Sequence, residues 1–481
     1  MTEPFVQATI DDARPPDTTP AAALPIDARD GVTGVSAATA EHRAQIVSGS
    51  VAGAIAKLAA PAVASMLLMT VFFTADSYWV GTRIGPRGLA AVSTSVFWIW
   101  MFISVAELVS VGLTAVAARR YGERDLARAA SAAGSALWLA LSLGVVVAGL
   151  GWLGLDHMFD LMHTSPDVTA LGKQYLGAYL VGTPLIFGFF AVDAAFRASG
   201  DTRTPFVLLL VSVGAALVLD PALILGIGPA PRMGIAGAAA ATIATRGAAF
   251  VVGLTILVRR RMVALRRISW PAIRSIVRVG LPTAGTGVLF SVIYILLTRT
   301  TTRFGTPALA ALGIGHRVES WTYMVGVGLA AAAAAIVGQN LGAGSSVRAA
   351  RAGWLAIGYA SAVGALGLVA MFFFSLPLAS LFTSDPATAE EGARYLRIVA
   401  ISTPFVGAEI VGEGALGGAG HTLPPMLSST LLTAVRIPIA AWAAPRFGTA
   451  GIWWTISLTA IARGSAMMLL WRAGGWKHRR L

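Results

Sequence analysis

Residues 183–205, "TPLIFGFFAVDAAFRASGDTRTP", are repeated in outline by residues 403–425, "TPFVGAEIVGEGALGGAGHTLPP". The offset between equivalent residues is 220 in the pairs Pro184–Pro404, Gly200–Gly420, Pro205–Pro425, Arg128–Arg348 and Tyr175–Tyr395. Nearer the start of each half, Pro61 and Pro282 are related by an offset of 221. A register kept through most of the sequence predicts that the protein consists of two homologous halves.

The composition indicates that both halves lie in a membrane. Apolar residues make up 56% of the 481 residues and charged residues only 12%, about half the share usual in soluble proteins. Apolar runs of roughly 20 residues recur, which is the length that crosses a bilayer as a helix. We expect an all-α membrane protein with twelve transmembrane helices, starting near residues 56, 90, 130, 174, 205, 235, 280, 308, 350, 393, 425 and 449.

Six helices separate equivalent positions, and an even number returns the second half to the same orientation. The halves are therefore expected to be parallel six-helix bundles, related by a pseudo-two-fold axis along the membrane normal, as in many secondary transporters. The expected segments are a disordered cytoplasmic tail (1–50), an N-terminal bundle (51–258), a basic cytoplasmic linker (259–279), a C-terminal bundle (280–472) and a basic tail (473–481).

Charged residues divide between alternate connections. Basic stretches such as "RRYGERDLAR" and "RRRMVALRRISWPAIRSIVR" alternate with acidic ones such as "DHMFDLMHTSPD" and "TSDPATAEEGA". By the positive-inside rule both termini are cytoplasmic, in a multi-pass protein of the cell membrane. The net charge of +13 is thus explained by topology, and a nucleic-acid partner is not expected. The absence of cysteine excludes disulfides and thiolate chemistry.

Several motifs resemble one known family. "KLAAPAVASMLLMTVFFTADSYWVGTRIGPRGLAAVSTS", "FRASGDTRTP", "LDPALILGIGPAPRMGIAGAAAATI" and "RVESWTYMVGVGLAAAAAAIVGQNLGAG" occur in the order found in the multidrug and toxic compound extrusion (MATE) family, with its DinF-like branch the nearest match. The likeness covers residues 55 to 470. It implies a monomeric exporter, not an enzyme, that moves organic cations or amphipathic drugs across the bilayer by alternating access. The coupling ion would be a proton or, less favoured, sodium, with no bound cofactor or metal.

Acidic residues inside apolar segments are the candidate machinery, because an ionised Asp at mid-helix costs about 2.5–3.5 kcal/mol on insertion scales. Asp76 and Asp220 both lie late in helices that run outward, so we expect them at similar depth in the N-terminal bundle. Burial favours the uncharged form of a carboxyl, which suits a group that takes up and releases a proton. The resemblance to the MATE family implies that Asp76 matches its acid in helix one and that Asp220 matches its acid in helix five. The alternative for each is an Asp that caps a broken helix or bonds a neighbouring Ser or Thr. For Asp220, a bend at Asp-Pro alone is a further alternative, because Pro221 follows it.

The other candidates are weaker. Asp193, a further coupling candidate, has Arg197 one turn later, a spacing that also suits an ordinary ion pair. The candidates for binding a cation or substrate are Glu413, Glu409, Glu319 and Glu107. Pro61 precedes Asp76 on the same helix and allows a bend. We hypothesise that protonation of Asp76 changes this bend.

Two departures from the family pattern bear on coupling. Sodium-coupled members carry an acid in helix seven where this chain has Phe290, and DinF-type members often have Asn where it has Ala216. The alternatives are a sodium-coupled exporter, a flippase for lipid-linked oligosaccharides, a channel or scaffold, and a membrane enzyme. Against the enzyme, the sequence has no HExxH, GxSxG or phosphate-loop motif.

Overall fold

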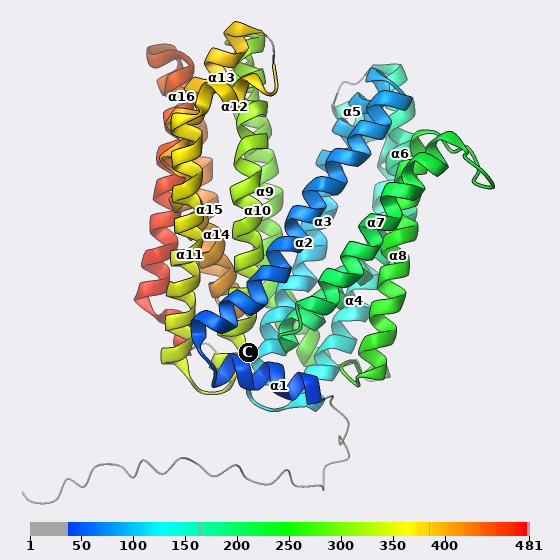
Figure 1. The fold of residues 1–481 in the computed structure, drawn as a ribbon, viewed down its shortest axis with the longest axis vertical. Helices are drawn as coiled ribbons and strands as arrows, with labels where there is room; N and C mark the ends of the chain where they lie inside the picture. Colours follow the sequence, from blue (N-terminus) through cyan, green and yellow to red (C-terminus); the bar gives the residue numbers. More distant parts are fainter. Residues whose placement is uncertain (1–36, 163–164, 267, 384, 479–481) are drawn as a thin grey trace, which may run out of the picture. The chain divides into compact units, whose positions relative to one another are not determined.

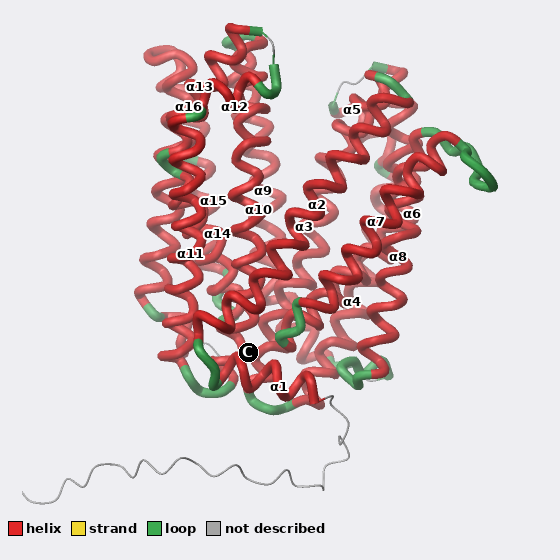
Figure 2. Tube along the Cα trace, in the orientation of Figure 1, coloured by secondary structure: helices red, strands yellow, loops and turns green. Residues whose placement is uncertain are grey.

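The computed structural model describes residues 37–478, apart from 163–164, 267 and 384. Within these ranges the chain forms helices and loops and contains no strand (Figures 1 and 2). The first six long helices form a bundle that we call the N-lobe, and the remaining ones form the C-lobe.

The N-lobe consists of α2 (Val51–Arg83), α3 (Pro86–Gly122), α4 (Leu126–Leu153), α6 (Pro166–Ser199), α7 (Arg203–Leu225) and α8 (Ile235–Arg259), with the short α5 (Leu155–Leu161). The C-lobe consists of α9 (Trp270–Thr302), α10 (Thr306–Gly342), α11 (Ser346–Phe373), α12 (Ser375–Ser380), α13 (Pro386–Ala400), α14 (Thr403–Gly418), α15 (Leu423–Ala434) and α16 (Arg436–Ala473), followed by the 3₁₀ turn Gly475–His478.

The lengths of these helices confirm the twelve expected spans. In the described chain, nine helices are long and apolar enough to cross a membrane, or ten if the bent pair α13–α14 is one span. One of the nine, Leu423–Ala473, has 51 residues, roughly 75 Å of helix at 1.5 Å per residue, which is enough for two crossings of about 30 Å. The non-helical residue Gly448 divides it. The 33-residue α9, equivalent to α2 in the repeat, completes the twelve.

The backbone repeats as the sequence does. Turns with positive φ fall at equivalent positions in both lobes, where the chain needs a left-handed residue: Gly85 and Gly305, Arg124 and Gly344, Gly200 and Gly420, Gly234 and Gly448. The last pair is offset by 214 residues, the others by 220. The two lobes therefore share loop geometry as well as helix order, which confirms the predicted duplication.

One helix breaks the repeat. α6 runs for 34 residues without interruption through Pro184, whereas its equivalent in the C-lobe is split into α13 and α14, which meet at 57°. The two residues between them, Ile401 and Ser402, are equivalent to Val181 and Gly182 in the middle of α6. Both lobes have Thr-Pro at the next two positions, so the proline alone does not cause the break.

The lobes meet through α2 and α3 on one side and α9 and α10 on the other. α3 and α9 cross at Gly112 and Gly280, where a side chain would collide with the carbonyls of Ile276 and Leu108 respectively. Further along, Gln339 donates a hydrogen bond to the Ala198 carbonyl, 2.7 Å away. These contacts lie toward the end of the molecule where α1 is found, which we call the α1 end, and the ribbons of the two lobes diverge toward the opposite end (Figure 1).

Helix α1 (Ala37–Val47) corrects part of the predicted tail. Residues 1–36 lie outside the described residues, but 37–47 form a helix that fastens both lobes together. Arg43 donates to the carbonyls of Tyr121 and Gly122 in the N-lobe, at 2.8 and 2.9 Å. From the C-lobe, Arg348 donates to the Ile46 carbonyl at 3.0 Å. Ile46 is fully buried, so this segment is part of the folded core and not a disordered extension.

The boundary between linker and C-lobe also moves. α9 begins at Trp270, ten residues before the predicted start, because Ser269 caps the helix by accepting a hydrogen bond from the Ala272 amide. The ordered connection after α8 is therefore short, and part of the predicted basic linker is helical.

Candidate functional site

Asp76 and Asp220 lie on neighbouring helices of the N-lobe, because α2 packs against α7. Their exposed fractions are 5% and 0%, and the two groups are close enough to interact electrostatically. One oxygen of Asp76 and both oxygens of Asp220 are enclosed with no hydrogen-bond partner. A buried, unpartnered carboxylate is costly while it is charged, so this pair is suited to holding a proton.

Tyr175 is the third member of this group. It lies on α6, is 6% exposed, and its hydroxyl is close enough to interact electrostatically with Asp76 and Asp220. The sequence showed Tyr175 only as the repeat partner of Tyr395. Its place beside the two acids depends on the convergence of α2, α6 and α7. The spacing of residues along the chain does not reveal which helices converge.

Arg246 is a buried cation that the sequence analysis missed. It projects from α8 into the N-lobe, is 8% exposed, and stacks over Phe72 and Phe189 with its guanidinium carbon 5.8 and 5.5 Å from the ring centroids. Its Nη2 atom lies 2.7 Å from the sulfur of Met69. An arginine in the middle of an apolar segment was the available signal, because basic residues there are as unusual as acidic ones.

Asp193 is ion-paired. Its carboxylate lies 2.8 Å from Arg197, and Arg197 also donates to the hydroxyl of Ser110 on α3 at 2.9 Å. The structure thus favours the ion-pair alternative for Asp193, in a contact that joins α6 to α3.

In the C-lobe, Glu409 is paired as well. Its carboxylate is 3.0 Å from Arg463 of α16 and accepts a hydrogen bond of 2.9 Å from Ser429 of α15. Glu409 and Arg463 are 5% and 9% exposed. The candidate acid Glu409 is therefore paired inside the lobe with an arginine that the sequence analysis did not consider.

Glu413 and Glu107 face each other across the lobes. α3 and α14 both run toward the α1 end, and they touch where Gly417 lies against Val111. Glu413 and Glu107 each precede that contact by one turn, and both are half-buried. They are the pair of candidate acids that the structure brings together from different lobes.

Glu319 lies on α10 beside Tyr395 of α13 and Arg436 at the start of α16. Arg436 is 3% exposed, and its Nε donates to Thr459 Oγ1 at 3.0 Å. Like Arg246 and Arg463, it was missed because only acids were considered as intramembrane candidates.

Pro61 lies within a continuous α2, where the hydroxyl of Ser65 donates to the Pro61 carbonyl at 2.9 Å. Among the described residues, no group of three or more His, Cys, Asp or Glu side chains is arranged to hold a metal.

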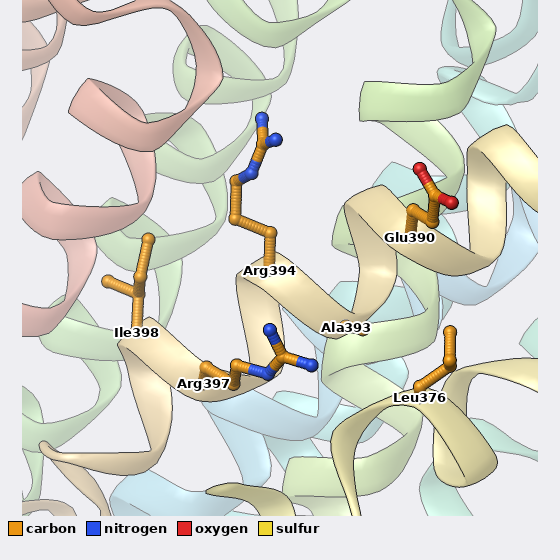
Figure 3. A pocket seen from close by; sticks show the side chains of 6 residues that line it. All are labelled: Leu376, Glu390, Ala393, Arg394, Arg397 and Ile398. Carbon is orange, nitrogen blue, oxygen red and sulfur yellow. The ribbon is translucent and has the colours of Figure 1, made fainter.

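A cavity of about 380 Å³ lies elsewhere, between α12 and α13, lined by Leu376, Glu390, Ala393, Arg394, Arg397 and Ile398 (Figure 3). Arg394 is ion-paired with Glu391 at 3.0 Å, and Arg397 donates to Ser375 at 2.9 Å. This cavity involves none of the predicted site residues.

A family model for MatE matches this chain twice, at residues 61–222 and 282–442. The chain belongs to the MatE family. The two matches coincide with the two lobes, which confirms both the suspected family and the internal repeat. Because the members found by comparison are transporters, this MatE protein is a multi-pass membrane transporter and not an enzyme.

Two relatives show the range of the MatE family. The chain is 30% identical to a probable multidrug resistance protein NorM of Thermotoga maritima, over 88% of this chain and 92% of that protein. It is 26% identical to an FAD transporter of Shewanella oneidensis, over 89% and 96% of the two chains. The structure of the Vibrio cholerae MATE transporter VcmN described as the bent form has the same fold, with a TM-score of 0.80, 21% identity, and coverage of 91% and 98%.

Proposed function

We propose that this protein exports organic cations in exchange for protons. The observation that carries the proposal is the pair Asp76 and Asp220, two buried carboxyls with unpartnered oxygens on adjacent helices beside Tyr175. In an apolar lobe the pair is most favourable with a proton, and it can release that proton when the lobe admits water. The pair thus gives the N-lobe a group whose charge changes during each transport cycle.

The proposed orientation places the α1 end in the cytoplasm. The connections at that end are rich in arginine, including Arg120, Arg261 and Arg348, while the opposite connections carry acids such as Asp167 and Glu390. Basic residues are retained on the cytoplasmic side of membranes. With the lobes in contact at this end, the structure corresponds to a state closed to the cytoplasm.

A proton is preferred to sodium for a chemical reason. Sodium binds best to several oxygen ligands held together, whereas α9 offers Phe290 where sodium-coupled members have an acid, and Glu409 is already paired with Arg463. The proposed role of Pro61 is to let α2, which carries Asp76, change its curvature when the charge changes.

A second candidate is export of an anionic dinucleotide such as FAD. Arg246 favours it, because this guanidinium is buried in the N-lobe against sulfur and aromatic rings. Its acidic neighbour, Asp193, interacts with it electrostatically but forms its ion pair with Arg197. The relative from Shewanella oneidensis is described as an FAD transporter. A lipid-linked oligosaccharide would need a basic cleft, and it remains a lesser alternative.

The test is transport by the full-length protein in vesicles loaded with ethidium or with FAD. A pH gradient should drive ethidium movement, and Asp76→Asn should abolish the response while Glu390→Gln, an exposed control, should not. Movement driven by a sodium gradient alone would replace the proton with sodium. Movement of FAD but not ethidium would select the second candidate, and no response to any gradient would refute export.

A further inference from the structure

Tyr395 occupies the position in the C-lobe that Tyr175 occupies in the N-lobe. Its side chain is completely buried, and its ring packs edge-on against Trp453 with the centroids 4.9 Å apart. The hydroxyl has no partner that meets hydrogen-bond geometry. A buried hydroxyl normally needs a polar neighbour, and the neighbour of this one is the carboxyl of Glu319.

The ring of Tyr395 packs against α10 at Gly315. A side chain at Gly315 would collide with the ring of Tyr395, so only glycine allows the approach. Glu319 follows Gly315 by one helical turn, on the same face of α10. The tyrosine hydroxyl and the Glu319 carboxyl consequently lie side by side, and Oε1 of Glu319 is also enclosed without a hydrogen-bond partner.

The third group is Arg436 of α16, which interacts electrostatically with both Tyr395 and Glu319. In the repeat it replaces Ala216 of the N-lobe. The C-lobe site thus has one carboxyl, one phenol and one fixed cation, whereas the N-lobe site has two carboxyls and one phenol.

The balance of charges around this site differs according to whether Glu319 carries a proton. The groups that face it or its neighbours, helix by helix, are His316, Glu319 and Tyr323 on α10, Tyr395 on α13, Glu409 and Glu413 on α14, Arg436 and Arg463 on α16, and Glu107 on α3. Within the C-lobe, three glutamates face two arginines. Arg463 is committed to Glu409, so one proton on the remaining glutamates makes this cluster of five groups neutral. Of the remaining glutamates, Glu319 has an enclosed oxygen without a partner of good hydrogen-bond geometry, which favours it over Glu413 as the place where that proton binds.

We propose that Glu319, positioned by Tyr395 and Arg436, is a second proton-binding site, so that each cycle exchanges one proton at the N-lobe pair and one at Glu319. The proton binds to the carboxylate on one side of the membrane and leaves from it on the other, with no other bond made or broken. This inference rests on the proposed function. Exchange of two protons for one monovalent cation moves net charge, so transport responds to membrane voltage.

The experiment measures coupling stoichiometry in vesicles containing the full-length protein. At zero voltage, a tenfold ethidium gradient is balanced by a pH difference of about 0.5 for two protons and about 1 for one, because each tenfold ratio is worth about 1.4 kcal/mol. The parent and the exposed control Glu390→Gln should balance at about 0.5, and Glu319→Gln at about 1. Glu319→Gln should also lose the response to voltage imposed without a pH difference.

A parent that balances near 1, or a Glu319→Gln variant that balances where the parent does, would overturn the inference while leaving proton-driven export intact. Absence of any pH-driven flux in the parent would instead refute the proposed function.

A second measurement does not depend on Glu319→Gln folding. The double variant Asp76→Asn, Asp220→Asn, purified and weakly buffered, should still release a proton when it binds ethidium, and release of none would also overturn the proposal. Tyr395→Phe, which keeps the ring against Trp453, should slow the exchange without changing the balance point, and an altered balance point would assign the proton to the phenol instead.

Discussion

The two lobes have the same helices but different interiors. At equivalent buried positions, the N-lobe has Phe189 where the C-lobe has Glu409, and Asp220 where the C-lobe has Ala440. One oxygen of Asp76 and both of Asp220 have no hydrogen-bond partner, whereas Glu409 of the C-lobe is held by Arg463 and Ser429. Duplication of a fold therefore preserves helix packing while a few buried positions assign different electrostatic roles to each copy.

The same contrast is seen in the backbone. The equivalent of the continuous α6 is broken by 57° between α13 and α14, and this places Tyr395 and Glu409 on separate helices. Tyr175 and Phe189, by comparison, share one rigid helix. The break thus sets the angle between the helices that carry the two polar groups of the C-lobe, and α6 has no such break.

The largest effect is expected from replacing an unpartnered acid. Asp220→Asn should reduce pH-driven ethidium efflux to background without lowering stability, because the amide removes a titrating group that no cation holds. Glu409→Gln should retain a pH-dependent efflux. Transport measured in vesicles, with thermal unfolding of the same preparations, checks both. The opposite pattern, with Glu409→Gln inactive and Asp220→Asn active, would reverse the roles assigned to the lobes.

The next largest effect concerns stability. Arg463→Leu should destabilise the protein by about 3–5 kcal/mol, because it leaves the buried carboxylate of Glu409 without its ion-pair partner. The double variant with Glu409→Leu should recover much of the loss, since both charges are then absent. Unfolding in lipid nanodiscs provides the measurement. Equal destabilisation by the single and double variants would show that packing, and not the ion pair, holds these helices.

A smaller effect is expected at the equivalent prolines of the two lobes. Pro61→Ala should slow efflux several-fold, because restoring a helical hydrogen bond worth about 1 kcal/mol stiffens α2 near Asp76. Pro282→Ala is the matched control on α9, which has Leu297 at the position equivalent to Asp76, and it should leave the rate nearly unchanged. If both variants slowed transport alike, the proline would serve folding in both lobes and not coupling.

The smallest effect lies in a loop, where Asp201 of the N-lobe is equivalent to His421 of the C-lobe. Burial opposes ionisation of Asp201, but hydrogen bonds from Thr204 and Arg260 outweigh it and hold its pKa below the ordinary value. A lowered folded-state pKa means that this stabilisation is complete above the unfolded pKa and is lost as pH falls through the folded one. Asp201→Asn should therefore cost about 1 kcal/mol near neutral pH and little in acid, as measured by unfolding across pH. A constant cost at all pH values would contradict this account.

The sequence predicted the helices and their duplication well, because apolar runs, prolines and turn glycines are local signals. It also predicted that Asp76 and Asp220 belong together, since their depth follows from helix direction. It missed Arg246, Arg436 and Arg463, because only acids were considered as intramembrane candidates. The contacts of these arginines depend on how distant helices pack, which the sequence does not show.

The remaining errors have the same origin. The break before Thr403 is absent from the equivalent Thr-Pro of α6, so no local pattern predicts it. α1 was missed because its main partners are backbone carbonyls of residues up to 79 positions away, and such acceptors leave no trace in the amino-acid sequence.

The way in which α1 joins the two lobes determines which amino-acid substitutions this end of the protein tolerates. Arg43 and Arg348 bind main-chain oxygens of Tyr121, Gly122 and Ile46, and these acceptors do not titrate and are present whatever side chain stands there. The side chains at these positions are constrained in another way, because Ile46 is fully buried and a side chain at Gly122 would collide with the Gln339 carbonyl. Loss of this closure can therefore arise by two routes: removal of a donor arginine, or a substitution at Ile46 or Gly122 that displaces the backbone carrying the acceptors.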